Sequence, residues 1–435
     1  MTAVRAAAAR VNTPGRDAVT VLCAAAVLLV LLPSYWVVPG VGGAGRPAVL
    51  LGLGALVWWG YAMATPQVQS PEPSPPLRVG AGTFVVALLA SYGAAAGVLQ
   101  TGVEQRAMDR AVLVTVGMVG LMLLAAEGIG RLDRLGRLIN VMLACAFVMA
   151  VIGIIQFRFG VDPTEWLQIP GLQSTAERSF MGERAGYTRV SGTAIHPIEF
   201  AVVLTTLLPM LLYRAFWASS RFWQAVAWTS VVVVAGAVLL TISRTAVLGL
   251  VAGGLVLAAG WSMARRVGVA VLAGGFIVVM QALVPGLIGT IYGLFTNWEN
   301  DPSVAARTRE LSEIDVALRD SPWLGRGPRT FVPELHGYVD NQYVLTLIEQ
   351  GLIGVSALLA LLGAAAWLAF RGMRAAPTPQ LADLNRALLA SVTVVAISFA
   401  TYDGLSFPMA TGVAFCVFGL TAAASRLTVA EGRTS

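Results

Sequence analysis

The chain has 435 residues, of which 57% are hydrophobic and 12% are charged, and its mean hydropathy is +0.75. A typical soluble domain is about 25% charged, so this composition excludes a soluble domain, a disordered chain and a disulfide-stabilised secreted module. The net charge is +6 and every basic residue is an arginine. Because that charge is spread over many connections, it does not indicate nucleic-acid binding and is better explained by membrane topology.

Apolar runs long enough to cross a bilayer recur along the chain. About 20 apolar residues span a hydrocarbon core of roughly 30 Å. This window predicts twelve transmembrane helices, at about residues 18–38, 47–65, 79–99, 111–128, 138–157, 196–213, 222–242, 245–263, 267–289, 343–370, 387–402 and 409–425. We therefore expect an all-α integral membrane protein that forms a single polytopic domain over residues 1–435. The first run lacks a small-x-small cleavage site after it, so we interpret it as a retained helix.

The distribution of arginine predicts the orientation of these helices. With the N-terminus in the cytoplasm, sixteen arginines fall in the predicted cytoplasmic segments and four in the short outer loops. This excess agrees with the positive-inside rule. We therefore expect a multi-pass protein of the plasma (inner) membrane with both termini in the cytoplasm.

Two predicted external loops are much longer than the other connections, at residues 158–195 and 290–342. Long loops between membrane helices usually have a function or are disordered. Within the second, residues 303–320 carry apolar side chains at helical spacing, and Ser303 is placed to cap a helix. We expect an amphipathic helix there, lying on or near the outer membrane surface.

Several polar residues that are far apart in the sequence fall near this external surface. They are Arg189, Arg244, Arg307, His336 and Asp340. Such convergence is what a catalytic site between outer loops would produce. The loops thus supply candidates for anion binding and for proton transfer.

Each candidate also has a plainer interpretation. Arg244, between two apolar runs, is either an interfacial anchor or a clamp for a phosphate or diphosphate. Arg307 lies among acidic residues, and from the helical pattern alone ordinary ion pairs on a helix surface are the favoured explanation. Either His336 or Asp340 is a candidate general base for a sugar hydroxyl. His196, before a proline at the head of a helix, favours a structural or interfacial role.

No metal site is predicted, because no HExxH, CxxC or acidic pair stands out. The three cysteines lie inside apolar runs and indicate small buried side chains.

The stretch from Arg307 to Gly354 carries a family pattern. An arginine lies fifteen residues before a proline, in R-x14-P-W-L-G-R-G-P-x-x-F, and VDNQYVLTLIEQGLIG follows. Upstream segments GIIQF, RVSGTAIHPIEFA and SRTAVLGL fit the same pattern. Together they resemble the O-antigen ligase and polymerase superfamily of bacterial membrane glycosyltransferases.

The resemblance implies a GT-C-like fold and an inverting, metal-independent transfer at the outer face of the membrane. It implies that Arg244 and Arg307, with Arg189 as a weaker third, hold the diphosphate of an undecaprenyl-linked glycan donor. Asp340 stands where the ligases have a histidine and is the expected base, with His336 as the alternative. The matching support residues are Asn341, Tyr343, Gly325 and Gly327. The acceptor would be a glycan or a lipid-linked acceptor, with no cofactor and no nucleic acid.

Two other classes of membrane protein share some of these features. A twelve-helix transporter or lipid-linked glycan flippase fits the helix count equally well, although transporters usually keep broken helices and charges near the midplane. A metal-dependent glycosyltransferase would use acids in the first outer loop, and residues 39–46 contain none. Asp340 in place of the histidine slightly favours a polymerase or a capsule-type ligase.

Overall fold

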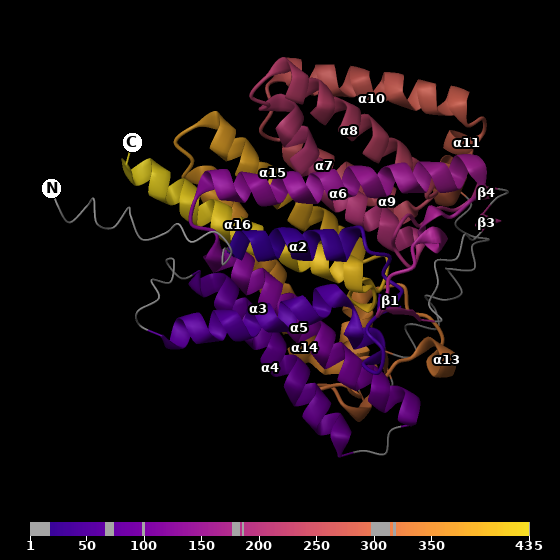
Figure 1. The fold of residues 1–435 in the computed structure, drawn as a ribbon, viewed down its shortest axis with the longest axis vertical. Helices are drawn as coiled ribbons and strands as arrows, with labels where there is room; N and C mark the ends of the chain where they lie inside the picture. Colours follow the sequence, from indigo (N-terminus) through magenta and orange to yellow (C-terminus); the bar gives the residue numbers. More distant parts are fainter. Residues whose placement is uncertain are drawn as a thin grey trace.

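The computed structural model describes residues 18–65, 74–97, 101–175, 183–184, 187–296, 314–315 and 319–434, which are largely helical (Figure 1). Each of the twelve predicted runs coincides for most of its length with one helix. These are α2 (Ala18–Val30), α3 (Pro47–Ala64), α4 (Pro75–Ala96), α5 (Gly102–Gly128), α6 (Leu132–Phe159), α7 (Pro197–Phe216), α8 (Arg221–Leu240), α9 (Arg244–Ala258), α10 (Met263–Leu283), α14 (Gln342–Arg374), α15 (Pro379–Phe399) and α16 (Pro408–Thr434).

Ten of these helices are long and apolar enough to cross a membrane, whereas α2 and α9 have only 13 and 15 residues. In the described residues, strands are limited to two pairs, β1 (Trp36–Val37) with β2 (Gln173–Ser174) and β3 (Glu183–Arg184) with β4 (Tyr187–Thr188). The prediction of an all-α multi-pass membrane protein is confirmed, and the count of twelve spans stays a prediction.

Several helices extend beyond the apolar runs that predicted them. Helix α5 begins nine residues earlier than expected, at a capping box in which Thr101 and Glu104 satisfy each other's backbone amides. A hydropathy window detects apolar side chains, whereas a helix continues as long as its backbone ends are capped. Helix α2 instead ends at Val30, eight residues early, because Pro33 follows and the chain then turns into β1.

The centre of the bundle is built on α16 and α5. Five-sixths of the apolar stretch of α16 is buried, and it packs against α5, α14 and α15. Helices α3 and α5 approach so closely that a Cβ on Gly52 would lie 2.2 Å from the carbonyl oxygen of Gly117. Small residues permit such contact between membrane helices. Helix α10, in contrast, is almost entirely exposed at the side of the bundle.

The helix bundle has two distinct ends (Figure 1). One, here called the loop end, carries the long connection between α6 and α7, α11 (Leu287–Thr296) and α13 (Pro333–His336). There the first long loop folds over the end of α2. The Tyr35 hydroxyl bonds Thr164, and the Ser34 amide donates to the carbonyl of Thr193 at 3.0 Å. The C-terminal end of α16 lies at the opposite end.

Ion pairs connect neighbouring helices at the opposite end of the bundle. Buried Glu127 of α5 accepts hydrogen bonds from Arg78 of α4 and, at 2.8 Å, from the Trp59 indole of α3. Asp383 of α15 accepts from Arg265 of α10 at 2.7 Å and from Arg386. Charges at membrane depth are tolerated when they are paired, so these groups tie neighbouring helices together.

Helix α14 is broken at Gly351, whose φ of +65° lies outside the helical region. The break releases backbone groups, and the segment 322–327 supplies their partners. Four backbone hydrogen bonds join the two segments: Leu352 to Pro322 (2.9 Å), Ile353 to Trp323 (3.2 Å), Gly327 to Glu349 (2.9 Å) and Arg326 to Ile348 (3.2 Å). The glycine-containing segment 322–327 is therefore held against the first part of α14 by these hydrogen bonds.

Replacing Gly351 by alanine is expected to lower stability by about 1–3 kcal/mol, since a side chain at positive φ is strained. Its Cβ would also lie 2.4 Å from the Trp323 carbonyl. The measurement is the thermal midpoint of the purified protein in detergent, followed by tryptophan fluorescence. Gly363→Ala on the same helix is the matched control, because no atom lies within 4 Å of its added Cβ. Equal midpoints for the two variants would contradict the assignment.

Candidate functional site

The turn at residues 400–407, between α15 and α16, connects two corners of the loop end. It contains the short helix η4 (Gly404–Ser406). On one side, the Thr401 hydroxyl donates to the hydroxyl of Thr245 at 2.9 Å. On the other side, the Leu405 amide donates to Gln342 Oε1 at 2.8 Å, and Arg329 donates to the Ser406 hydroxyl. The beginnings of α9 and α14, far apart in sequence, are thereby joined.

The first corner holds two of the predicted arginines. Arg244 is the first residue of α9, directly after the capping position Ser243. The Arg189 Nε donates to the carbonyl of Thr241 at 3.2 Å, three residues before Arg244. Ile242 between them has a φ of +50°, which is a genuine outlier for a β-branched residue. The structure thus brings Arg189 and Arg244 to one tight, strained turn between α8 and α9.

The second corner holds Asp340 at the head of α14. The Asn341 side chain caps this helix by accepting from the amides of Tyr343 (3.0 Å) and Val344 (3.2 Å). The Tyr343 hydroxyl donates to the carbonyl of Ala396 on α15 at 2.8 Å. Asn341 and Tyr343 therefore fix the point from which the exposed Asp340 side chain projects.

The predicted glycines allow the loop before α14 to lie directly against that helix. Gly325 has a φ of +66°, and a Cβ there would lie 2.3 Å from the Glu349 backbone. Arg329 follows, and it too has a positive φ, +61°. The backbone amides of Arg329 and Phe331 bond the Glu349 carboxylate, which is buried. Because the loop lies so close to α14, Arg329 reaches the 400–407 turn.

Asp403 in this turn is a candidate that the sequence reasoning missed. It bonds the Ser406 side chain and lies within electrostatic range of both Arg329 and Asp340. The pKa of Asp403 is raised to about 6, mainly by burial and in smaller part by the charge of Asp340. The only signal was a Tyr-Asp-Gly sequence between the last two apolar runs, and that pattern is not distinctive by itself.

The two histidines lie in surroundings of their own. His336 Nε2 is 3.0 Å from Arg326 and 3.3 Å from Glu104, and its ring stacks on Phe331. His196 caps α7 by accepting from the Ile198 amide. Burial, together with the Arg189 charge, lowers the pKa of His196 to about 4. His196 is thus a neutral capping group, and His336 belongs to a cluster with α5.

Arg307 and most of the expected amphipathic helix at 303–320 lie outside the residues that the structure describes. The short described pieces of that segment are helical, and Arg319 forms an ion pair with Asp315 at 2.5 Å. The placement of Arg307 relative to Arg244 therefore stays a prediction.

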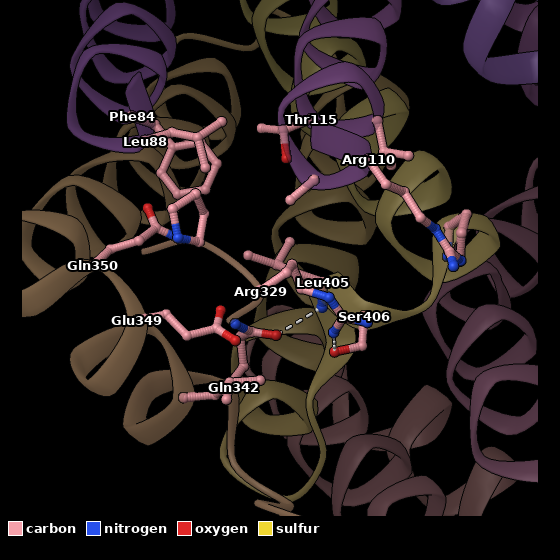
Figure 2. A pocket seen from close by; sticks show the side chains of 15 residues that line it. Phe84, Leu88, Arg110, Thr115, Arg329, Gln342, Glu349, Gln350, Leu405 and Ser406 are labelled. Carbon is pink, nitrogen blue, oxygen red and sulfur yellow. Dashed lines mark hydrogen bonds between the residues drawn. The ribbon is translucent and has the colours of Figure 1, made fainter. Parts of the chain in front are cut away.

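A small pocket of about 40 Å³, partly open to solvent, lies beside the 400–407 turn. Figure 2 shows Glu349, Gln342 and Arg329 around it, together with Gln350 from α14 and Thr115 from α5. Apolar side chains Phe84 and Leu88 of α4 close another side. The Oε1 atom of Gln350 is buried and has no hydrogen-bond partner among the residues that the structure describes. The pocket therefore offers carboxylate, amide and guanidinium groups against an apolar wall.

In the described part of the chain, no group of three or more His, Cys, Asp or Glu side chains is arranged to hold a metal ion. Residues 229–359 match the protein family described as O-antigen ligase. This match supports the resemblance of the chain to the O-antigen ligase and polymerase superfamily. Together with the long apolar helices, it supports a membrane enzyme of the O-antigen ligase/polymerase type. No curated protein matches the chain in sequence.

The superfamily match covers Arg244, Arg307 and Asp340, and ends in α14. The segments upstream of it have clear structural roles. The Gln156 side chain of GIIQF bonds the Ser191 and Gly192 amides and the Gly192 carbonyl, at 2.8–3.2 Å. The buried Glu199 carboxylate accepts from the amides of Met409 (2.9 Å) and Ala410 (3.2 Å). These contacts anchor the segment of Arg189 and the first turn of α16.

The pKa of Asp403 gives a pH-dependent prediction. Its folded-state pKa, about 6, exceeds the ordinary value of 3.8, so the stability due to its protonated form is present below about pH 4 and is lost as pH rises through 6. Asp403→Asn is therefore expected to stabilise the protein at pH 8, by on the order of 2 kcal/mol, and by about half as much at pH 5.

Thermal unfolding in detergent at both pH values checks this. Asp320→Asn serves as the control, because Asp320 is exposed at the same end of the molecule. An equal shift for Asp403→Asn at pH 5 and pH 8 would contradict the assigned burial.

Proposed function

We propose that this enzyme transfers or polymerises an undecaprenyl-diphosphate-linked glycan at the outer face of the plasma membrane. The reaction would be metal-independent and would invert the anomeric centre. In this orientation the loop end faces the exterior and both termini lie in the cytoplasm. The proposal combines the superfamily match with one geometric observation, the joining of the Arg244 corner and the Asp340 corner by the 400–407 turn.

The arginine corner would bind the leaving group. Guanidinium groups bind phosphate oxygens through two parallel hydrogen bonds. Arg244 at the start of α9 is proposed to hold the donor diphosphate together with Arg307, with Arg189 as a third, weaker contributor. The positive end of the α9 backbone dipole adds to this attraction. As the bond between the anomeric carbon and the diphosphate oxygen breaks, these charges stabilise the developing anion.

The carboxylate corner would activate the acceptor. Asp340 is proposed to accept the proton of an acceptor hydroxyl while its oxygen attacks the anomeric carbon from the side opposite the diphosphate. Partial burial raises the pKa of Asp340, which favours its accepting a proton. Arg329 interacts electrostatically with both Asp403 and the buried Glu349 and would offset part of their negative charge. Attack opposite the leaving group gives inversion.

The side chains that line the small pocket beside the turn are proposed to contact a hydroxyl group of the acceptor. Among them, the Glu349, Gln342 and Gln350 side chains provide hydrogen-bonding groups suited to sugar hydroxyls. Whether the acceptor is another lipid-linked glycan, as in a polymerase, or a different molecule, as in a ligase, would be decided by the product that accumulates in a deletion strain.

Removing either diphosphate arginine tests the clamp. Arg244→Ala and Arg307→Ala are each expected to lower transfer by about 10²–10³-fold, the usual cost of losing one group that stabilises a transition-state anion. Product yield and length in membranes supplied with lipid-linked glycan provide the measurement, with EDTA present to test metal independence. Arg319→Ala, in the same long loop, is the matched control, since Arg319 is exposed and paired with Asp315. Normal product from both variants would overturn the clamp.

The identity of the base is tested separately. Asp340→Asn is expected to lower kcat by about 10²–10⁴-fold, whereas His336→Gln should leave kcat near the wild-type value because His336 already contacts Glu104 and Arg326. Asp340→His should restore part of the rate and move the acidic limb of the pH–rate profile to higher pH. The reverse pattern, with His336→Gln inactive and Asp340→Asn active, would assign the base to His336.

A transporter or flippase of lipid-linked glycan is the competing function. The break in α14 at Gly351 is a feature that transporters also use. Reconstituted liposomes distinguish the two functions. Movement of lipid-linked glycan across the bilayer without any new glycosidic bond would favour the transporter, and new glycosidic bonds would favour the transferase.

A further inference from the structure

A second basic pocket lies at the opposite end of the bundle from the candidate site. It has a volume of about 130 Å³ and is enclosed by α4, α14 and α16. Three arginines line it, Arg371 of α14 with Arg426 and Arg433 of α16. Among the described residues, none that lines it is acidic. The lining therefore carries a formal charge of +3, which favours an anion.

The three arginines lie at different depths in this pocket. Arg426 forms the inner wall, where it donates to the carbonyls of Ile129 (2.7 Å) and Ala126 (3.2 Å) at the end of α5. Arg371 and Arg433 are exposed at the rim. Neither takes part in a salt bridge within the described residues. Their guanidinium groups are available to a ligand that approaches from outside the bundle.

The α4 terminus adds to the positive potential. Helix α4 begins at Pro75 and Pro76, both in the pocket lining, so its positive dipole end faces the site. The buried carboxylate of Glu127 lies close by, but it is held by Arg78 and Trp59. It is therefore already compensated within the protein.

The surroundings of the pocket indicate a lipid rather than a soluble anion. The arginine rim adjoins apolar lining from Leu368, Ala422 and Val429. On α14, Trp367 and Phe370 are each 48% exposed just before Arg371, whose guanidinium lies over the Trp367 ring at 5.4 Å. Exposed aromatic side chains beside arginines are typical of the level of lipid headgroups, and basic pockets between membrane helices bind anionic headgroups.

We propose that this pocket binds the phosphate headgroup of an anionic phospholipid, with the acyl chains lying along the exposed face of α14. This site is separate from the proposed glycan-transfer site and does not depend on it. A bound lipid would join α4, α14 and α16, two of which begin at the candidate site. Anionic lipid is therefore expected to stabilise the folded protein, because a ligand that binds only the folded state raises its stability.

The test uses the full-length protein in detergent with added phosphatidylglycerol or phosphatidylcholine. Native mass spectrometry measures the lipid bound, and thermal unfolding measures stabilisation. Arg371→Gln/Arg433→Gln is expected to weaken phosphatidylglycerol binding by about ten- to thirtyfold and to abolish its stabilising effect. Arg374→Gln/Arg221→Gln is the matched control, since it removes the same charge from exposed positions at the same end outside the pocket.

Three results would overturn the proposal. The first is unchanged phosphatidylglycerol binding by the pocket variant, and the second is an equal loss in the control, which would indicate general surface attraction. The third is inorganic phosphate displacing phosphatidylglycerol at equal concentration, which would indicate a soluble anion. Because lipid binding is measured without substrate, failure here is distinguishable from failure of the proposed glycan transfer.

Discussion

A backbone amide or carbonyl at membrane depth needs a hydrogen-bond partner, and this constraint organises the candidate site. Helix α14 breaks at Gly351, and the turn at 322–327 supplies the partners for the interrupted backbone. Arg329 follows this turn in the sequence and contacts the 400–407 segment. The hydrogen bonds that compensate for the break in α14 thus fix the positions of Asp340, Glu349 and Arg329. An intact α14 would leave the loop without an attachment.

The 400–407 turn extends that arrangement across the bundle. It contacts Thr245 beside Arg244 on one side and Gln342 beside Asp340 on the other. Both non-glycine residues with positive φ in the described chain, Ile242 and Arg329, lie at the two contacts. Such strain persists when surrounding structure holds it in place, and it is common at functional sites. The backbone strain and the polar side chains therefore mark the same region.

The sequence predicted the architecture well where the signal was local. Apolar runs located helices α2 to α10 and α14 to α16, because hydrocarbon thickness imposes a length that is visible in one dimension. Helix ends were less accurate, as α2 and α5 show, because a hydropathy window does not detect that Pro33 follows the end of α2 or that Thr101 and Glu104 cap α5. The motif residues Asn341, Tyr343 and Gly325 were recognised, but their tasks as cap, tether and contact surface were not.

The sequence by itself determined that the chain is a multi-pass membrane protein, and its motifs indicated the superfamily. Apolar length, arginine distribution and motif spacing are properties of the chain read in order. The contacts between helices joined Arg189 to the Arg244 turn, placed His336 against Arg326 and Glu104, and introduced Asp403 and the basic pocket between α4, α14 and α16. Those relations depend on contacts between helices far apart in sequence, and no local pattern specifies which helix ends will meet.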